Sequence, residues 1–255
     1  MFNKKDEQRN INENQLEGRN AVLELLKSGK DIDKIIVAKG NVEGTIKRII
    51  GEASRKGIVI QEVARQKLDE ISQTKNHQGV IAIASAHSYA TVEEILENAA
   101  SKNEPPFIII LDGITDPHNL GPIMRTAECA GAHGIIIPKR RSVGLTAVVG
   151  KTSAGAIEYM PVAKVTNISN TIEELKEKGV WIASTDMDGE TYFNADLKGP
   201  IAIVIGSEGE GVSRLVKEKC DFNVSIPMYG NISSLNASVA AGLIMYEIVR
   251  KRKFL

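Results

Sequence analysis

The chain has 255 residues, of which 42% are hydrophobic and 25% are charged, a composition typical of soluble globular proteins with one large or two small domains. Its 32 basic residues equal its 32 acidic residues in number, so the net charge does not indicate a nucleic-acid partner. No apolar run approaches the roughly 20 residues that span a bilayer, and the polar N-terminus lacks the apolar stretch of a secretory signal. We therefore expect a cytoplasmic protein without a membrane partner.

The cysteine and histidine residues do not form a recognisable metal-binding pattern. Cys129 and Cys220 lie far apart and belong to no CxxC pair. The four histidines show no metal-ligand spacing. The sequence therefore predicts neither a structural zinc site nor another bound metal.

The N-terminal part of the chain is predicted to hold a tail, a small domain and a linker. Residues 1–16 show no hydrophobic periodicity, which is typical of a disordered tail. Short apolar strands alternate with helical patterns over 17–86, which indicates a small α/β domain. Residues 87–106 are predicted to be a linker that contains a helix, because Pro105 and Pro106 favour extended backbone. The predicted strands of the small domain are 34–38, 58–63 and 79–85, and its predicted helices are 19–28, 42–57 and 64–72.

A second α/β domain is predicted over 107–255. Its strands are near-continuous apolar runs that alternate with helical segments, a pattern typical of a mostly parallel sheet covered by helices on both faces. Ligands of such sheets bind beyond the C-terminal ends of the strands. We therefore expect a site in the loops after Gly113, Gly206 and Met228. The predicted strands are 107–113, 134–138, 159–165, 180–185, 201–206 and 222–228.

The first segment of interest is ITDPHNLGPIMRTAECAGAHGIIIP, residues 114–138. Asn119 is predicted to be the N-cap of a helix, and Pro122 would then lie in the first turn, where proline is tolerated. Arg125 follows about one turn later, on a helix that otherwise faces a core. A functional role for Arg125 has a simpler alternative, a surface ion pair with Glu128 that contributes a few tenths of a kcal/mol.

The second segment is IAIVIGSEGEGVSRLV, residues 201–216, in which a buried strand leads into a glycine-rich turn. Turns of this kind often bind phosphate, but Glu208 and Glu210 would repel a phosphate group. A ligand that carries an ammonium or sulfonium group fits this turn better. The alternative is a tight strand-to-helix turn whose glutamates stabilise the helix N-terminus.

The third segment is SIPMYGNISSLNASVAAGLIMYEIVRKR, residues 225–252. An irregular loop precedes a long helix that is predicted to begin near Leu235 with small residues, which permit close approach of a ligand or another backbone. Ser234 fits the N-cap of that helix, which would give it a purely structural role. Asn236 is a poor helix former in a first turn and is harder to explain structurally.

Three further segments suggest a function: one resembles a nucleotide-binding loop, and two are clusters of basic residues. The segment GLTAVVGKT, residues 144–152, is close to a P-loop, but its gap holds five residues rather than four and no strand leads directly into it, so we expect no nucleotide there. Two local clusters of basic residues could contact RNA, namely 139–141 and 250–253. The second of these also fits a solvated helix end.

Together the three segments resemble the three motifs of the SpoU/TrmH methyltransferases within the SPOUT superfamily. The matching residues are NLGPIMRTAECAGA, IGSEGEG and IPMYGNISSLNASVAA, in the same order and at strand ends. The preceding domain, with EGRNAVLELL and NHQGVIA, resembles the small RNA-binding domain of the members that act on large-subunit rRNA. The likeness is strongest to the bacterial 23S rRNA guanosine-2′-O-methyltransferases.

This resemblance implies a fold, a cofactor and an assembly that periodicity does not reveal. Family members have a trefoil-knotted domain, bind S-adenosylmethionine in the knot and act as homodimers, so we expect all three features here. The resemblance places the methyl donor against Gly206, Ile226, Met228 and Leu235. It also implies an active site whose residues are Asn119, Arg125, Glu208, Ser234 and Asn236.

The resemblance predicts methylation of a guanosine 2′-hydroxyl in large-subunit (23S) rRNA. Arg125 is a poor candidate for the base, because a guanidinium is effectively never deprotonated in proteins. It could instead stabilise the developing alkoxide or hold a phosphate, and Glu208 is a possible proton acceptor. The alternatives are a tRNA guanosine-2′-O-methyltransferase of the same family and a non-catalytic RNA-binding or ribosome-assembly protein that retains the fold.

Overall fold

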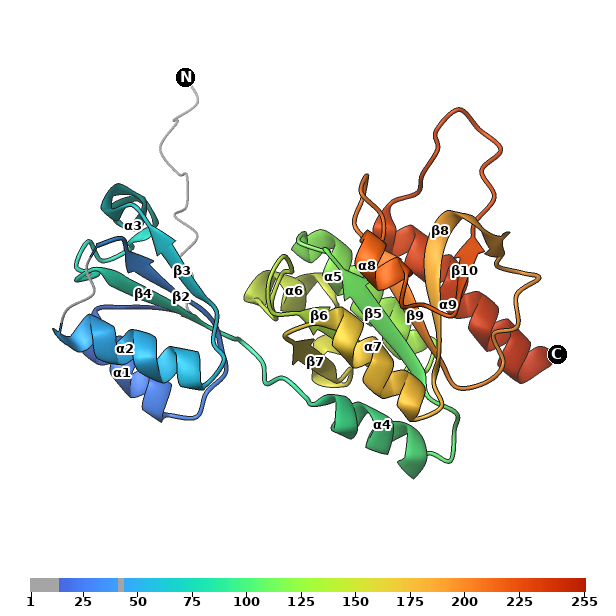
Figure 1. Ribbon diagram of the computed structural model, residues 1–255, viewed down its shortest axis with the longest axis horizontal. Coiled ribbons are helices and arrows are strands. Elements are labelled where there is room, and N and C mark those ends of the chain that lie inside the picture. The colour runs from blue at the N-terminus through green and yellow to red at the C-terminus, as the bar shows by residue number, and fades with distance from the viewer. Residues whose placement is uncertain (1–13, 41–43) are drawn as a thin grey trace, which may run out of the picture. The chain divides into compact units, whose positions relative to one another are not determined.

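The computed structural model describes residues 14–40 and 44–255, and the chain divides into two compact units between Ser88 and Tyr89 (Figure 1). Most of the predicted tail, residues 1–13, lies outside the described residues. The last part of that predicted tail is structured, because Gln15–Glu17 form the first strand, β1. No helix in the described part of the chain is long and apolar enough to cross a membrane.

The N-terminal unit is a four-stranded mixed sheet in the order β1-β4-β2-β3, with helices on both faces. Its apolar side chains form two clusters: α1 and α2 cover one face of the sheet, and α3 contributes Leu68 to the other. The unit is thus an α/β structure, and its strand β1 comes in addition to the three strands predicted within 17–86. The elements are β1 (Gln15–Glu17), α1 (Arg19–Lys27), β2 (Ile32–Ala38), α2 (Gly44–Arg55), β3 (Ile60–Val63), α3 (Arg65–Ile71) and β4 (Val80–Ala84).

Glu17 connects β1 to the loop before β4. Its carboxylate accepts hydrogen bonds from the hydroxyl groups of Ser72, at 2.7 Å, and Thr74, and from the side-chain amide of Gln15, at 2.7 Å. Partial burial favours the protonated form, but the hydrogen bonds from Thr74, Ser72, Gln73 and Gln15 outweigh it and lower the pKa of Glu17 to about 2. The charged carboxylate therefore holds this loop in place.

The C-terminal unit is a six-stranded sheet in the order β10-β8-β9-β5-β6-β7, in which every neighbouring pair is parallel. The central strands β5 and β9 are buried along their whole length, which explains their uninterrupted apolar sequences. The elements are α4 (Val92–Ser101), β5 (Phe107–Asp112), α5 (Pro117–Cys129), β6 (Gly134–Pro138), α6 (Ala147–Thr152), a 3₁₀ turn (Ala156–Glu158), β7 (Val162–Val165), α7 (Ile168–Glu177), β8 (Trp181–Thr191), β9 (Ile201–Gly206), α8 (Arg214–Lys217), β10 (Phe222–Ser225) and α9 (Ala237–Phe254).

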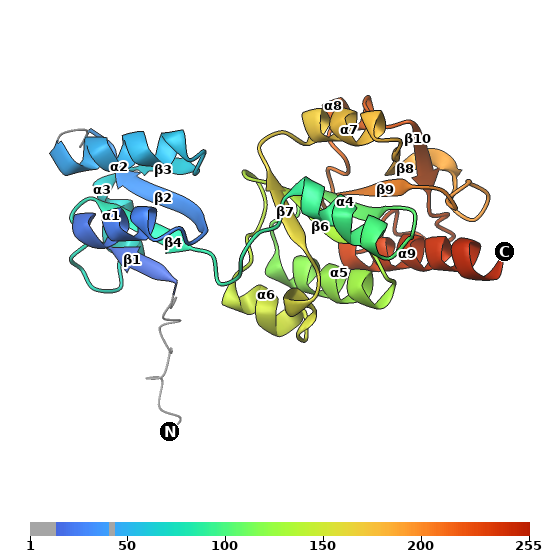
Figure 2. The same ribbon diagram turned by 90° about the horizontal axis from the view of Figure 1, so that it is seen from below.

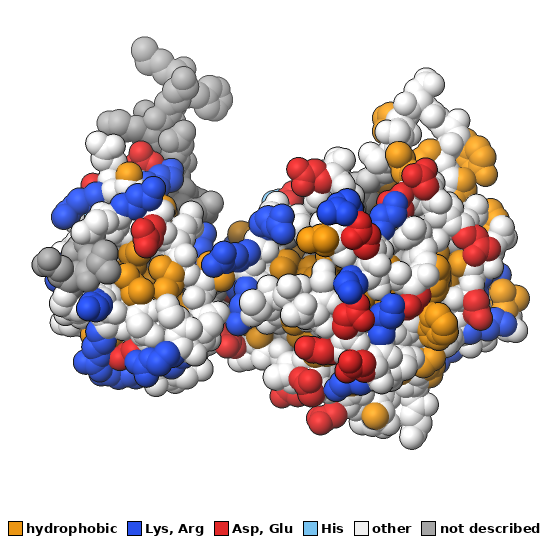
Figure 3. Space-filling view, in the orientation of Figure 1, with side chains coloured by type: hydrophobic (Ala, Val, Ile, Leu, Met, Phe, Trp, Pro, Cys, Tyr) orange, Lys and Arg blue, Asp and Glu red, His pale blue; other side chains and the backbone are white. Residues whose placement is uncertain are grey.

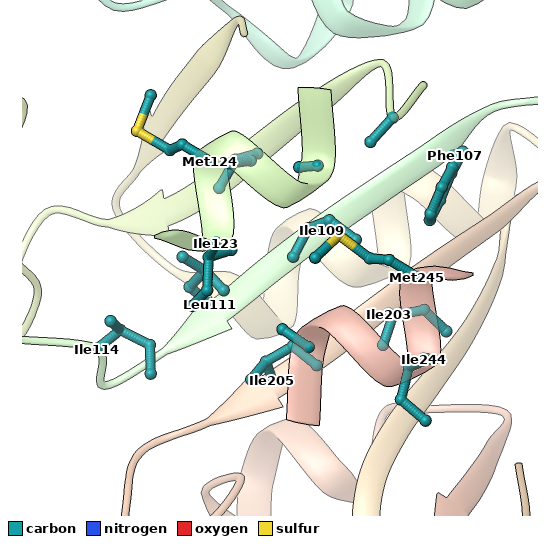
Figure 4. Close-up of a cluster of buried hydrophobic side chains, with 14 of the residues drawn as sticks. Phe107, Ile109, Leu111, Ile114, Ile123, Met124, Ile203, Ile205, Ile244 and Met245 are labelled. Carbon is teal, nitrogen blue, oxygen red and sulfur yellow. The ribbon is translucent and has the colours of Figure 1, made fainter. Parts of the chain in front are cut away.

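Helices cover both faces of this sheet (Figure 2). On one face, α5, α6 and α9 pack against alternate residues of the central strands, including Ile109 and Leu111 (Figure 4). On the other face, α4, α7 and α8 pack against Ile108 and Ile110. The predicted fold class, a mostly parallel sheet with helices on both faces after a small α/β domain, is confirmed. The trefoil knot stays a prediction.

Most of the segment 87–106, which the sequence predicted to be a linker, belongs to the C-terminal unit. Its helix α4 begins after Thr91, whose hydroxyl accepts a hydrogen bond from the Glu94 amide while the Glu94 side chain accepts one from the Thr91 amide. Ile95 of this helix is fully buried in the core. A Cβ on Gly134 would lie 2.5 Å from the Ile95 side chain, so α4 packs directly against β6.

Candidate active site

Three loops lie at the C-terminal edge of the larger sheet, after the adjacent strands β9, β5 and β6. The loop after β5 begins at Gly113, whose φ of +84° favours glycine. It leads into α5, whose N-cap is Asp116 rather than the predicted Asn119: the Asp116 carboxylate accepts a hydrogen bond from the His118 amide at 2.8 Å. Asn119 therefore lies inside the first helical turn, and Pro122 lies beyond that turn.

The turn after β9 is built by close backbone approach. A Cβ on Gly206 would lie 2.0 Å from the carbonyl carbon of Gly211, so only glycine fits at position 206. The chain then folds back on itself, because the Gly211 amide donates to the Ser207 carbonyl oxygen at 2.9 Å. Gly209, at the tip, has a φ of +87°. This geometry exposes the Glu208 side chain between the ends of β5 and β9.

Glu208 connects three segments that are far apart in sequence. Its Oε1 accepts a hydrogen bond from Nδ2 of Asn119 at 2.9 Å and another from Nδ2 of Asn236 at 2.6 Å. Asn236 Nδ2 also donates to Oδ1 of Asn119 at 2.8 Å, which closes a triangle of side chains. The Ala237 amide adds a longer contact to Glu208, at 3.4 Å. We call Asn119, Glu208 and Asn236 the polar triangle.

Asn236 is also the N-cap of α9. Its Oδ1 accepts hydrogen bonds from the Ser238 amide at 3.0 Å and from the Ser238 hydroxyl at 2.6 Å. The alternative that Ser234 caps this helix is therefore wrong. Ser234 is instead exposed in the preceding loop, where its side chain lines the adjoining pocket. Capping fixes Asn236 through its oxygen and leaves its amide nitrogen for the polar triangle.

A pocket of about 370 Å³ opens beside the polar triangle. The four predicted donor-binding residues, Gly206, Ile226, Met228 and Leu235, all line it, together with Glu208 and Ser234. Its lining combines apolar side chains with the glycine-rich turn after β9. The described residues include no cluster of three or more His, Cys, Asp or Glu that could hold a metal.

The sequence did not point to the part of the pocket wall that comes from β8. Thr185, Asp186 and Met187 line the pocket, although the predicted strand ended at 185. They lie in an interruption of the β8–β10 pairing, where the partner of Asn223 is Ser184 and the partner of Val224 is already Glu190. A hydrogen bond from Lys217 lowers the pKa of Asp186 despite its partial burial. Hydrophobic periodicity could not predict these residues, because the irregular part of a strand has no regular alternation of apolar and polar residues.

Arg125 lies apart from the polar triangle. It is exposed on α5, six residues beyond Asn119 and so about 9 Å further along the helix axis. Within residues 14–40 and 44–255 its side chain forms no ion pair or hydrogen bond, so its pairing with Glu128 is not observed. A structural role for this side chain within one chain is therefore not supported.

The P-loop-like segment 144–152 has a packing role. Helix α6 begins after Thr146, whose hydroxyl accepts from the Val149 amide at 3.3 Å. At its other end, the Thr152 hydroxyl donates to the Pro117 carbonyl oxygen at 3.0 Å and lies where a Cβ on Gly121 would be. Helix α6 thus holds the N-terminal turn of α5, and with it Asn119.

Comparison with known proteins identifies the family. Residues 106–246 match the model of the SpoU rRNA Methylase family, and residues 15–90 match the model of the RNA 2′-O ribose methyltransferase substrate-binding domain. The chain belongs to the SpoU rRNA methylase family, as its three motifs predicted. It is an RNA 2′-O-ribose methyltransferase, and the predicted class of enzyme is confirmed.

Relatives and solved structures agree with this family. The chain is 54% identical over 236 residues to YacO of Bacillus subtilis, which is named a TrmH family tRNA/rRNA methyltransferase. The aligned residues are 92% of this chain and 94% of that protein. A similarly named Staphylococcus aureus protein is 48% identical over 236 residues, which are 92% of this chain and 95% of that protein.

Among solved structures, the TrmH/SpoU tRNA modifying enzyme from A. aeolicus has a TM-score of 0.54 and 29% identity over 59% of this chain and 77% of that one. The SpoU methyltransferase AviRb from Streptomyces viridochromogenes, solved with AdoMet, has a TM-score of 0.58 and 23% identity over 93% of this chain and 89% of that one. The likeness to AviRb shows a shared fold.

Proposed function

We propose that this enzyme transfers the methyl group of S-adenosylmethionine to the 2′-hydroxyl of a guanosine in large-subunit rRNA. The observation that carries this proposal is the polar triangle at the mouth of the pocket. It brings Asn119 of α5, Glu208 of the turn after β9 and Asn236 at the start of α9 into hydrogen-bond contact. Such convergence at the C-terminal ends of parallel strands is where α/β enzymes place their chemistry.

The pocket suits a cationic donor. Glu208 and Glu210 both line it, and two carboxylates favour an ammonium or sulfonium group over a phosphate. Gly206 carries no side chain, so the donor can approach its backbone closely. Ile226, Met228 and Leu235 supply apolar surface in the pocket. When bound, S-adenosylmethionine supplies an electrophilic methyl group. Two structurally similar proteins, AviRb from Streptomyces viridochromogenes and an rRNA methyltransferase from Sinorhizobium meliloti, were solved with AdoMet bound, which supports this choice of donor.

The reaction needs a ribose hydroxyl to lose its proton while its oxygen bonds to the methyl carbon and the carbon–sulfur bond breaks. Asn119, Asn236 and Ser234 offer neutral hydrogen bonds that position the hydroxyl. Glu208 is the proton acceptor in this proposal, because it is the carboxylate at the centre of the triangle. Arg125 stabilises the developing alkoxide or holds the adjoining phosphate, since it has no structural partner in the described chain.

The substrate is proposed to be rRNA rather than tRNA on the strength of the N-terminal unit. The family models name rRNA for the catalytic part and RNA substrate binding for residues 15–90, whereas the curated relatives are named for both RNAs. Ribose methylation mapped across rRNA and tRNA, with and without the gene, tests the proposal. Loss of a 2′-O-methylguanosine from large-subunit rRNA supports it. A mark lost only from tRNA, or no mark lost from either RNA, contradicts the choice of substrate.

A homodimer is proposed as the working form. Helix α9 exposes Val239, Leu243 and Tyr246, which are spaced four and three residues apart and therefore share one face of the helix. A second copy that covers this face would bring groups near Arg125, because α5 and α9 pack side by side. Light scattering that finds a stable, active monomer contradicts this assembly.

The N-terminal unit is proposed to bind RNA and to contribute little to donor binding. A fragment that begins at Tyr89 keeps α4 and should bind the donor in calorimetry with unchanged affinity, while it loses methylation of the natural RNA. A fragment that begins at Glu104 lacks the buried Ile95 and should lose several kcal/mol of stability. Full RNA methylation by the Tyr89 fragment contradicts a substrate-binding role for the N-terminal unit.

A further inference from the structure

The two basic clusters, 139–141 and 250–253, differ in the ion pairs and hydrogen bonds that their side chains form. At the end of α9, Arg250 pairs with Glu247 at 2.7 Å, and Lys253 pairs with Glu104 at 3.2 Å. The guanidinium of Arg252 donates to the carbonyl oxygens of Pro105, Pro106 and Gly199. Lys251 is buried and donates to the Ala195 carbonyl oxygen. Each of these four cations has a partner within the chain.

The cluster after β6 is arranged differently. Arg140 and Arg141 are exposed, and in the described part of the chain neither forms an ion pair or a side-chain hydrogen bond. The same is true of Lys151 at the end of α6. The segment 139–157 contains four basic residues and no acidic residue. By contrast, basic and acidic side chains alternate over α7 and α8 (Figure 3), where pairs such as Lys219–Glu173 form.

Arg140, Arg141 and Lys151 lie at the same edge of the sheet as the polar triangle. The Val143 amide donates to the Ile114 carbonyl oxygen at 3.0 Å, which joins the loop after β6 to the loop that leads to Asn119. Lys151 precedes Thr152, whose hydroxyl contacts Pro117, two residues before Asn119. Because β6 and β9 are separated only by β5, the loop of arginines and the loop of Glu208 begin about 10 Å apart.

We infer that Arg140, Arg141 and Lys151, which we call the basic rim, bind the phosphates of the RNA strand that flanks the target nucleotide. This inference rests on the proposed function and adds the surface of the catalytic unit that holds the RNA. Guanidinium groups bind phosphate through two parallel hydrogen bonds, and an arginine or lysine side chain reaches across the remaining distance to a neighbouring nucleotide. Asp116 is an acidic residue in the loop after β5, at this edge of the sheet. Its carboxylate caps α5 through a hydrogen bond from the His118 amide.

The test is the double variant Arg140→Gln, Arg141→Gln. Each lost phosphate contact removes about one unit from the slope of log affinity against log salt, so the slope should fall by about 2. The affinity for a 23S rRNA transcript, measured by fluorescence anisotropy over a range of salt, should fall about tenfold at physiological salt. The KM for that RNA should rise with it, while the donor affinity in calorimetry stays as in the wild type.

A matched control removes two cations from the opposite edge of the same sheet. Lys102→Gln with Lys198→Gln changes the net charge by the same amount at two exposed lysines, after α4 and before β9, whose side chains form no ion pair in the described part of the chain. An unchanged salt slope in the control, with a reduced slope in the arginine pair, supports the basic rim. Equal effects in both variants, or no effect in the arginine pair, overturn it. A wild-type enzyme that binds the donor yet methylates no RNA contradicts the proposed function itself, which keeps the two failures distinct.

Discussion

Replacement of Glu208 by glutamine is the sharpest perturbation of the polar triangle. The substitution keeps the shape of the side chain and one carbonyl oxygen, so Asn119 and Asn236 can still donate to it. It removes the negative charge and any capacity to accept a proton at neutral pH. The substitution therefore separates a carboxylate that only organises the two asparagines from one that takes part in the reaction.

The loss of rate expected for Glu208→Gln differs between a carboxylate that only organises the asparagines and one that acts as the base. Glu208 Oε1 accepts two short hydrogen bonds, at 2.6 and 2.9 Å, and hydrogen bonds to a charged group contribute about twice as much as neutral ones. Loss of the charge should cost about 0.5 kcal/mol per bond at this exposed site, or about 1 kcal/mol in total. An effect of that size on the transition state is about fivefold in rate, whereas loss of a general base costs about 100-fold or more.

The assay is single-turnover methyl transfer at saturating donor and RNA. We expect a loss of 100-fold or more for Glu208→Gln. Glu210→Gln is the control, because Glu210 lies in the same turn and lines the same pocket but forms no hydrogen bond to the asparagines. A loss of donor affinity in both variants would assign the carboxylates to the donor's positive charge. A rate within tenfold of wild type for Glu208→Gln would refute its assignment as the base.

Three further predictions concern separate features. Arg125→Ala should lower the single-turnover rate about 100-fold or more while stability changes by less than about 0.5 kcal/mol, and a wild-type rate refutes a catalytic role. Gly206→Ala should abolish donor binding in calorimetry, because its Cβ would lie 2.0 Å from Gly211, whereas Gly230→Ala, with open space around it, should not. The pKa of Glu17 is lowered to about 2, so its stabilisation is fully present above about pH 4.5 and is lost as the pH falls through 2. Glu17→Gln should therefore cost about 1–2 kcal/mol in urea unfolding at pH 7 and far less at pH 2, and equal costs at both pH values contradict this role.

Apolar patterning determined most of the fold. The runs FIIIL and IAIVI are buried on both faces of a parallel sheet, and this environment is what an uninterrupted apolar strand requires. Long local motifs determined the family, because each keeps many residues in a fixed order. Local pattern also predicted a candidate site at the ends of β5 and β9, since the C-terminal edge of such a sheet is set by its topology.

Only the tertiary structure decided which side chains meet. The hydrogen bonds from Asn119 and Asn236 to Glu208 span 89 and 28 residues, and no periodicity encodes contacts over such separations. The same holds for the caps: Asp116 and Asn236 cap their helices, although Asn119 and Ser234 fitted the local pattern equally well. Basic sequence alone likewise could not distinguish the paired cations at the end of α9 from the unpaired arginines after β6, because the carbonyl and carboxylate partners come from distant segments that only folding brings together.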